Sequence, residues 1–319
     1  MVTGGAGYIG SHVVRELQNA GISVVVLDNL STGVRGFVPS DVPLVEADLL
    51  DIASVRAALA EHSVTGVIHI AGFKFAGISV EKPLHTYQQN VTAMMSLLQA
   101  MEAQEVGKIV FSSSSSVYGN AASGLVTEHD PFNPTSPYGE SKVIGEWLLR
   151  NQGVASGLVH TSLRYFNVVG SGDPTLPDVS PYNLFSMVFA GLENDRLPVI
   201  FGDDYDTPDG TCIRDYIHVA DLAAAHVGAA QRMDRGESIE PAYNLGSGTG
   251  TSVAEMMAAI SRVTRIEFTA EVGSRRAGDP ARVVASGEKA SRDIGWTMSH
   301  SLEDMIRSAF EARKNLPRE

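Results

Sequence analysis

Tyr138 and Lys142 are the residues of this sequence whose types and spacing could carry out acid–base chemistry. They stand four apart in a stretch that we expect to be helical, 137–150, with Ser136 and Pro137 as its start signal. Residues at that spacing lie on one face of a helix. A tyrosine has a pKa of about 10, too high for a base at neutral pH, but a nearby ammonium group favours the phenolate. The pair could therefore take a proton from a substrate hydroxyl.

A run of five serines, 112–116, follows a short apolar stretch that we expect to be a strand. Open α/β folds place their binding sites at the carboxyl ends of parallel strands. A serine hydroxyl at this point could therefore hydrogen-bond a substrate alcohol. The spacing alone does not select which serine does so.

The glycine-rich segment 3–10, Thr-Gly-Gly-Ala-Gly-Tyr-Ile-Gly, contains Gly-x-Gly-x-x-Gly and also spaced glycines at Gly4, Gly7 and Gly10. Glycines permit a tight turn and let a pyrophosphate approach the N–H groups at a helix start. Asp28 stands 28 − 10 = 18 residues beyond Gly10, where a carboxylate holds the adenosine ribose. The segment predicts a dinucleotide site, and Asp28 favours NAD because it would repel a 2′-phosphate.

These residues need a scaffold, and the first half of the sequence alternates apolar runs with helical stretches. The apolar runs are 24–27, 44–45, 67–70, 109–111 and 158–163. The helical stretches are 11–20, 52–61, 83–104 and 137–150. Strands that are apolar throughout are typical of a parallel sheet buried on both faces. The alternation predicts an α/β fold with a doubly wound parallel sheet, a Rossmann fold.

After residue 170, prolines and glycines interrupt shorter elements, and helical patterns return at 218–232, 252–264 and 301–314. We expect a smaller mixed α/β C-terminal domain that faces the substrate. The predicted dinucleotide-binding domain covers 1–168 and is rejoined by about 214–246, and the substrate domain covers 169–319.

The first strand of such a sheet should hold four to six residues, but three precede the first glycine. We therefore expect either that a few residues are missing ahead of Met1 or that a short first strand suffices.

Composition narrows the classes of partner. The 319 residues carry 24 Lys plus Arg against 37 Asp plus Glu, a formal net charge of −13. An acidic surface repels phosphate backbones and anionic lipids, so nucleic-acid and membrane partners are disfavoured. We find no apolar run of membrane-spanning length and no signal-peptide pattern. The single cysteine, Cys212, cannot form an internal disulfide, which indicates a cytosolic protein.

The histidines carry no metal-ligand spacing, so we expect no metal site. His69 lies in an apolar run and is expected to pack in the core.

Longer strings around these motifs resemble those of the extended short-chain dehydrogenase/reductase superfamily and, within it, the UDP-glucose 4-epimerase family. The strings are 28–30, 67–74, 136–142, 163–167, 209–219 and 243–246, and the similarity runs from Val2 to about Leu302. The resemblance implies an isomerase of galactose metabolism that interconverts UDP-glucose and UDP-galactose. The sugar C4 would be oxidised transiently, and bound NADH would return the hydride to either face.

The resemblance also implies roles for particular residues. Tyr138 is the base, Ser114 bonds the sugar O4, and Lys142 holds the nicotinamide ribose and lowers the pKa of Tyr138. The implied NAD-binding residues are Gly4, Gly7, Tyr8, Ile9, Gly10, Asp28, Asn29, Leu30, Ser31, Thr32, Gly33, Asp48, Leu49, Ile70, Ala71, Gly72, Phe73, Lys74, Asn90, Ser112, Tyr138, Lys142 and Tyr165. The implied UDP-sugar-binding residues are Lys74, Ser114, Tyr138, Phe166, Asn167, Asn183, Leu184, Val199, Ile200, Phe201, Arg214, Arg276 and Asp279.

Three alternatives stay open. One is a 4-epimerase of another UDP-sugar: a uronic acid, a pentose or an N-acetylhexosamine. Another is a nucleotide-sugar 4,6-dehydratase, which commonly needs an Asp-Glu pair where this sequence has Ser115 and Ser116. The third is a non-catalytic NAD-binding protein, which would often have lost the tyrosine or the lysine.

The resemblance further implies a cytoplasmic homodimer that forms through the helices at 83–104 and 137–150. The alternative is that both helices bury their apolar faces on their own sheet.

Overall fold

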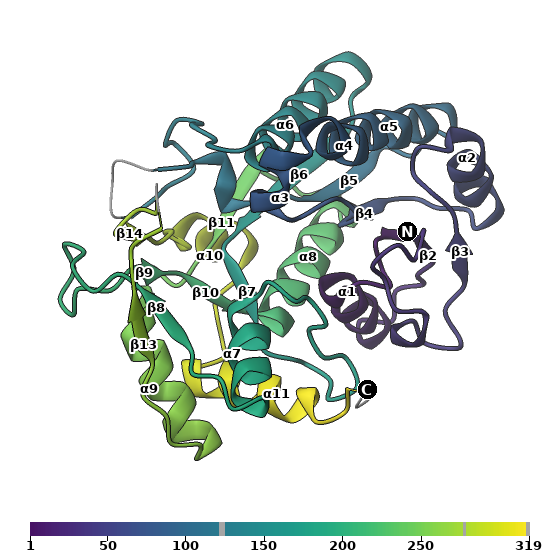
Figure 1. The fold of residues 1–319 in the computed structure, drawn as a ribbon. Helices are drawn as coiled ribbons and strands as arrows, with labels where there is room; N and C mark the ends of the chain where they lie inside the picture. The colour runs from purple at the N-terminus through teal and green to yellow at the C-terminus, as the bar shows by residue number, and fades with distance from the viewer. Residues whose placement is uncertain (121–124, 277–278, 317–319) are drawn as a thin grey trace.

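The computed structural model describes residues 1–120, 125–276 and 279–316, and a seven-stranded parallel sheet lies at its centre (Figure 1). The strand order is β11-β6-β5-β4-β1-β2-β3, and every neighbouring pair is parallel. The strands are β1 (Val2–Thr3), β2 (Val26–Asp28), β3 (Leu44–Glu46), β4 (Val67–His69), β5 (Lys108–Ser112), β6 (Val159–Tyr165) and β11 (Ala242–Leu245). The order reverses at β1, so the predicted doubly wound sheet is confirmed.

Helices cover both faces of this sheet (Figure 1). They are α1 (Tyr8–Asn19), α2 (Ile52–Glu61), α3 (Ala76–Glu81), α4 (Pro83–Tyr87), α5 (Ala93–Ala103), α6 (Pro137–Ser156) and α8 (Val219–Asp234), with short 3-10 turns at Arg35–Phe37 and Ser115–Val117. One core cluster joins α1 and α8 to the sheet. A second joins α2, α5 and α6 to the opposite face. The carboxyl ends of the strands thus lie between two helical layers, as a doubly wound fold requires.

The central strand β1 has two residues, and both pair with β2 and β4. A cavity of about 650 Å³ lies at the amino-terminal ends of the neighbouring strands, lined by Met1, Val24 and Val67 among others. The Met1 amine donates to the Gly66 carbonyl at 2.8 Å, and burial lowers the pKa of this amine to about 5. A two-residue strand is therefore held in the middle of the sheet by pairing on both sides.

The C-terminal part forms a smaller mixed α/β unit, as the sequence predicts. Its strands are β7 (Asn167–Val169), β8 (Val199–Phe201), β9 (Ile213–Arg214), β10 (Tyr216–His218), β12 (Thr251–Ser252), β13 (Glu271–Gly273) and β14 (Arg282–Val283). Its helices are α7 (Leu184–Glu193), α9 (Val253–Thr264) and α11 (Leu302–Arg313), whereas α10 (Glu288–Ile294) packs on α8 and β11 of the main sheet. A third core cluster joins α7, α9 and α11. Ser252 and Ser301 begin α9 and α11 with capping boxes, which explains why both starts are readable in the sequence.

The prediction of a single helix at 83–104 was wrong. The structure divides it into α4, a π-helical turn at Gln88–Thr92, and α5. Asn90 lies within that turn and hydrogen-bonds both backbone groups of Phe73. A hydrogen bond to a loop 17 residues away leaves no mark on the hydrophobic period, so the period predicts one uninterrupted helix.

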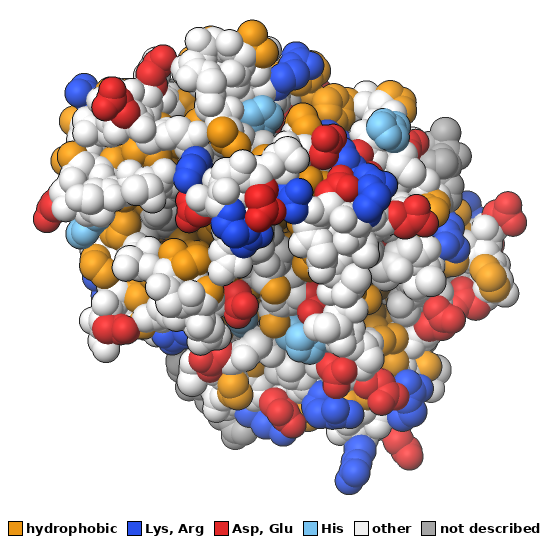
Figure 2. Space-filling view, turned by 180° about the vertical axis from the view of Figure 1, so that it is seen from behind, with side chains coloured by type: hydrophobic (Ala, Val, Ile, Leu, Met, Phe, Trp, Pro, Cys, Tyr) orange, Lys and Arg blue, Asp and Glu red, His pale blue; other side chains and the backbone are white. Residues whose placement is uncertain are grey.

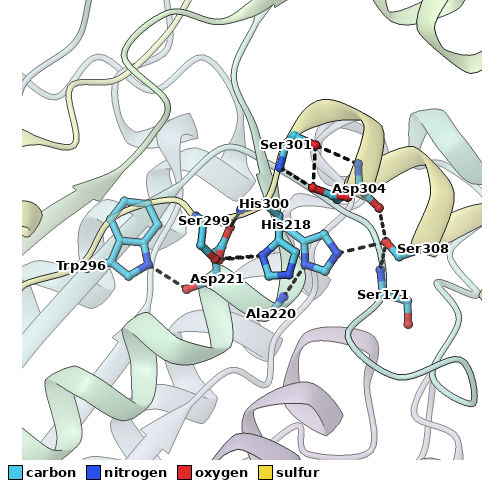
Figure 3. A network of polar contacts seen from close by, with 10 residues as sticks. All are labelled: Ser171, His218, Ala220, Asp221, Trp296, Ser299, His300, Ser301, Asp304 and Ser308. Atoms are coloured by element: carbon cyan, nitrogen blue, oxygen red, sulfur yellow. Dashed lines mark hydrogen bonds and ion pairs between the residues drawn. The ribbon is translucent and has the colours of Figure 1, made fainter. Parts of the chain in front are cut away.

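A buried polar network joins α8 to the C-terminal helix α11 (Figure 3). His218 accepts a hydrogen bond from the Ala220 amide and lies 3.0 Å from Ser308 of α11. Its ring stacks on that of His300, with centroids 4.0 Å apart. Asp221, 4% exposed, lies 2.9 Å from Nδ1 of His300. These contacts hold the C-terminal unit against a helix of the main sheet.

The surface seen in Figure 2 carries acidic and basic side chains intermixed. Among the residues that the structure describes, no helix has the length and apolar character needed to cross a membrane.

We expect the fold to lose stability as the pH falls below about 6.5, the pKa of a histidine in an unfolded chain. Burial, together with the neighbouring His300, lowers the pKa of His218 to about 4. The unfolded chain therefore binds this proton more readily than the folded chain. The contribution of His218 to the free energy of unfolding is thus complete above pH 6.5 and decreases as the pH falls towards 4. The expected loss from His218 alone is about 2 kcal/mol at pH 5. Thermal unfolding measured between pH 7 and pH 5 checks this.

The control is His218→Asn, because asparagine can still accept the Ala220 amide at the start of α8 but does not titrate. The variant should show a smaller decrease in melting temperature over the same pH range. Equal decreases in both proteins would contradict the role of His218.

Candidate active site

The turn between β1 and α1 brings two backbone segments into close contact. Gly4 has a φ of +73°, the left-handed region that glycine favours. A Cβ on Gly10 would lie 2.0 Å from the Gly4 carbonyl oxygen, so a side chain there would force the turn apart. Gly7 begins α1 without any side-chain cap. The first N–H groups of the helix therefore stay available to an anion.

Asp28 ends β2 beside this turn and is 8% exposed. Its carboxylate accepts hydrogen bonds from the amides of Ala6 at 3.0 Å and Leu30 at 2.9 Å. A Cβ on Gly33 would lie 2.8 Å from the same carboxylate. The loop after β2 is thus wrapped around Asp28, whose oxygens keep further capacity to accept hydrogen bonds.

Hydrogen bonds join the neighbouring residues of the predicted dinucleotide site to one another. Asn29 donates to Asp48 at 2.9 Å and accepts from the amide and hydroxyl of Ser31. Thr32 is exposed, whereas Leu49 is buried in a core cluster. The carboxyl ends of β2 and β3 are thereby joined at one edge of the sheet.

The loop after β4 is fixed by the π-helical turn. Asn90 accepts from the Phe73 amide at 2.6 Å and donates to the Phe73 carbonyl at 2.9 Å and to Ser141 at 2.9 Å. A Cβ on Gly72 would lie 3.0 Å from Asn90 and 4.0 Å from Nζ of Lys142. Residues 70–73 therefore run directly past the predicted catalytic lysine.

Tyr138 and Lys142 meet the serine run, as their spacing predicts. Ser114 hydrogen-bonds the Tyr138 side chain. Nζ of Lys142 lies 5.8 Å from the Tyr138 ring centroid and donates to the Ser112 carbonyl at 2.9 Å. Ser136 caps α6 by accepting from the Gly139 amide, which fixes where this face of the helix begins. One helix and one strand end thus bring together a phenol, an ammonium group and a hydroxyl.

Burial acts against the expected lowering of the Tyr138 pKa. Burial raises the pKa of Tyr138 above its usual value, and the Ser114 hydrogen bond offsets this in part. Burial also lowers the pKa of Lys142 to about 8, although Glu146 opposes the change. Lys142 points at the Ser112 carbonyl, so it does not by itself make the phenol acidic.

Tyr165 lies behind this pair and near Tyr138, and its hydroxyl is hydrogen-bonded by Ser112. The Ser112 hydroxyl is 2.7 Å from Nε2 of His226, whose Nδ1 is 2.9 Å from the Leu222 carbonyl. Because a carbonyl can only accept, Nδ1 carries the proton and Nε2 accepts from Ser112. The Ser112 hydroxyl therefore joins Tyr165 to His226.

The predicted UDP-sugar residues form two pairs in the C-terminal unit. Nη2 of Arg214 lies 3.6 Å from Asp279. The guanidinium of Arg276 stacks 3.9 Å from the Phe201 ring centroid. Val199 and Ile200 precede Phe201 on β8. Two arginines thus lie on neighbouring parts of this unit, each beside a group that orients it.

Other predicted residues have their side chains engaged within the protein. The Tyr8 hydroxyl donates to the Gly170 carbonyl at 2.6 Å. Asn167 donates to the Asp215 carbonyl at 2.9 Å, and Asn183 donates to Asp178 just before Leu184 begins α7.

The two units also touch through aromatic rings. Phe75, in the loop that contains Lys74, packs edge-on against Tyr182 with centroids 5.0 Å apart. Phe166 connects β6 to β7 at the same boundary. The predicted dinucleotide and substrate residues therefore belong to adjoining surfaces.

Sequence reasoning missed the buried side chains behind the site, namely Ser113, Glu146, Arg164 and His226. Glu146 is four residues beyond Lys142 on the same helix. That spacing was a usable signal, whereas nothing in the sequence brings Arg164 or His226 to the site.

The fold and the site define a dinucleotide-dependent enzyme of the extended short-chain dehydrogenase/reductase class. The glycine turn leaves no room for a side chain at Gly10 and presents free N–H groups, and Asp28 stands beside it. These residues fit the pyrophosphate and ribose of NAD.

Comparison with known proteins supports this class. A family model described as the NAD dependent epimerase/dehydratase family matches residues 1–246. The UDP-glucose 4-epimerase of Azospirillum brasilense is 42% identical over 322 residues, which span 99% of this chain and 92% of that protein. The crystal structure of UDP-glucose 4-epimerase from Brucella ovis in complex with NAD has a TM-score of 0.94 and 38% identity, covering 98% and 97% of the two chains.

A third relative is the UDP-glucose-4-epimerase from Stenotrophomonas maltophila, solved with bound NAD and formylated UDP-arabinopyranose. It has a TM-score of 0.92 and 38% identity, covering 98% of this chain and 97% of that one. The chain belongs to the NAD-dependent epimerase/dehydratase family and, within it, to the group formed by the UDP-glucose 4-epimerases.

Replacing Gly10 with alanine should remove bound NAD, because the new Cβ would overlap the Gly4 carbonyl oxygen. We expect the NAD content per purified chain to fall at least about tenfold. Nucleotide released by denaturation and measured by absorbance and chromatography checks this. Gly36→Ala is the matched control, because nothing lies within 4 Å of a Cβ there. A normal NAD content in Gly10→Ala would contradict the proposed fit of the turn.

Proposed function

We propose that the protein interconverts UDP-galactose and UDP-glucose through Tyr138, Lys142 and Ser114. The observation that carries the proposal is the meeting of these three side chains at the carboxyl end of β5, beside a turn that fits NAD. NAD held there would supply the hydride chemistry at the sugar C4. The family relationship supports the same reaction.

The chain's own residues would hold NAD along the carboxyl edge of the sheet. Amides after Gly7 face the pyrophosphate, and Asp28 accepts from the adenosine ribose. The 31–33 loop and Asp48 border the adenosine, and residues 70–74 and Asn90 border the nicotinamide. Lys142 holds the nicotinamide ribose.

Tyr138 moves the proton. Its phenolate oxygen takes the O4 proton of the sugar as C4 is oxidised, and it gives the proton back when C4 is reduced. Ser114 donates to the same sugar oxygen and orients it. Since burial raises the pKa of Tyr138, the phenolate needs more positive charge than Lys142 alone supplies. The oxidised, cationic form of NAD would add that charge.

The substrate is held by its nucleotide part. Arg214 and Arg276 carry guanidinium groups that match the oxygens of a diphosphate. Residues 166–167, 183–184, 199–201 and Asp279 complete this side. The hexose meets small side chains such as Ser114, which leave the 4-keto sugar room to turn over between the two hydride transfers.

The proposed domain assignment follows from these two binding roles, one for the dinucleotide and one for the UDP-sugar. Residues 1–168, with the returning 214–246 segment that supplies β11 of the main sheet, would bind the dinucleotide. Residues 169–319 would bind the UDP-sugar. Cys212 is buried and free, which supports a cytosolic setting for the protein.

Tyr138→Phe should lower the rate of epimerisation at least about 100-fold, because phenylalanine cannot accept the O4 proton. The measurement starts from UDP-galactose, follows UDP-glucose formation and adds no NAD. A panel of UDP-pentoses, UDP-uronic acids and N-acetylated UDP-sugars, run in parallel, compares the other substrates.

Tyr243→Phe is the matched control. Its hydroxyl accepts from the Glu240 amide at the opposite end of the sheet, so its loss should cost one hydrogen bond and leave activity unchanged. A full rate in Tyr138→Phe would contradict the assignment of the base.

We also propose that two copies pair through α4, α5 and α6. These helices expose large apolar side chains, namely Leu84, Met95 and Trp147, and Leu84 is 83% exposed. Exposed apolar groups on adjacent helices favour burial against a partner. A second copy of the chain supplies the same surface, as a two-fold interface requires.

Sedimentation should therefore show a particle of twice the mass of one chain. Leu84→Glu should shift it to a single chain, because a buried carboxylate without a partner is costly. Val272→Glu, on the exposed face of β13, is the control and should remain a dimer. A wild-type protein that sediments as one chain would contradict the proposal.

A further inference from the structure

Glu146 lies beneath the catalytic pair and has no part in the mechanism above. It follows Tyr138 and Lys142 at four-residue spacing on α6, so the three side chains share one face of the helix. Its side chain is 8% exposed. A carboxylate at this depth is rare unless it is paired.

The carboxylate is held on both of its oxygens. Ser113 donates its hydroxyl to Oε1 at 2.5 Å. Arg164, on β6, donates through Nε to Oε1 at 2.9 Å and through Nη2 to Oε2 at 2.6 Å. Glu146 therefore has hydrogen-bond donors on both oxygens, two of them from a charged guanidinium.

Arg164 is itself fixed in place. Its Nη1 donates to the Tyr118 hydroxyl at 2.7 Å, and that hydroxyl donates to Asn244 at 2.7 Å. Its guanidinium also lies 4.9 Å from the Phe132 ring centroid. The guanidinium is therefore held by Tyr118 and Phe132 as well as by Glu146.

Stability alone is a weak reason for this arrangement. Removing two charges from water costs about as much as their attraction returns, and apolar side chains of similar size often stabilise a core better. The effects of the pair on its neighbours are specific. Glu146 adds negative charge next to Lys142, and through Ser113 it anchors the residue between Ser112 and Ser114.

We propose that Glu146 is a positioning residue for epimerisation: its carboxylate keeps Lys142 in the ammonium form and fixes the strand end that presents the Ser112 carbonyl and the Ser114 hydroxyl. The inference rests on the proposed function. Arg164 acts one step further away, by holding the carboxylate in its place.

The groups around Lys142 allow the charge effect to be isolated. Tyr138 and Glu146 face it from α6. His69 faces it from β4, and because burial and Lys142 lower the pKa of His69 to about 3, this ring stays neutral in the working range. From β5, Lys142 meets the Ser112 carbonyl and the Phe111 ring, which do not titrate.

The test is Glu146→Gln, which keeps the shape and an acceptor for Ser113 but removes the charge. Burial lowers the pKa of Lys142 to about 8 while Glu146 raises it, so loss of the carboxylate should lower it further. In the pH–rate profile, the alkaline limb should then move to a pH about one unit lower. Glu146→Asp should restore the limb, and the exposed Glu102→Gln on α5 should leave it unchanged.

A second readout does not need turnover. Carbon-13 labelling of the lysines gives six resonances, of which Lys142 is identified by its absence from Lys142→Met. Titration of protein stripped of nucleotide should show a lower pKa for Lys142 in Glu146→Gln than in wild type. If that variant fails to fold because Arg164 is left unpaired, Glu146→Gln combined with Arg164→Met serves in its place.

An unchanged Lys142 titration together with an unchanged alkaline limb would overturn the inference. A uniform loss of rate with the same limb and titration would also overturn it, because that indicates a structural role only. If wild type shows no epimerisation, the proposed function fails, while the lysine titration still decides whether Glu146 controls Lys142.

Discussion

The hydrogen bond from Lys142 to the Ser112 carbonyl is the contact on which the rest of the site depends. It ties helix α6 to the end of strand β5 at 2.9 Å. Tyr138 lies one turn before Lys142 on the helix, and Ser114 lies two residues beyond Ser112. The single contact therefore sets the phenol against the serine hydroxyl, and it does so in a region from which water is largely excluded.

Burial is the main constraint on this chemistry. It raises the pKa of Tyr138 and lowers that of Lys142, so both residues are driven towards their neutral forms. A base at neutral pH then requires charges placed close by, since electrostatic interactions are strongest where the effective dielectric is low.

Much of this site could be predicted from the sequence, because its main parts are local. The glycine turn, Asp28 after β2, and the Tyr138–Lys142 spacing each lie within one element or one turn. The parallel sheet followed from the alternation of apolar runs with helical stretches. The sequence could not show the partners that come from distant segments. His226 reaches Ser112 from α8, 114 residues away, and Arg164 reaches Glu146 from β6. The burial that raises the pKa of Tyr138 is likewise not visible in a four-residue spacing.

The π-helical turn at Gln88–Thr92 has a consequence for how this segment tolerates change. Such a turn contains one residue more than an ordinary helical turn, so everything after it is rotated by about 100° relative to a straight helix. The core contacts of α5, which include Met94 and Leu97, are set by that rotation. Deleting one residue here would leave an ordinary helical turn, and α5 would keep the same face towards the core. The wide turn, which includes Asn90, therefore lets this segment carry one extra residue without moving the core contacts of α5.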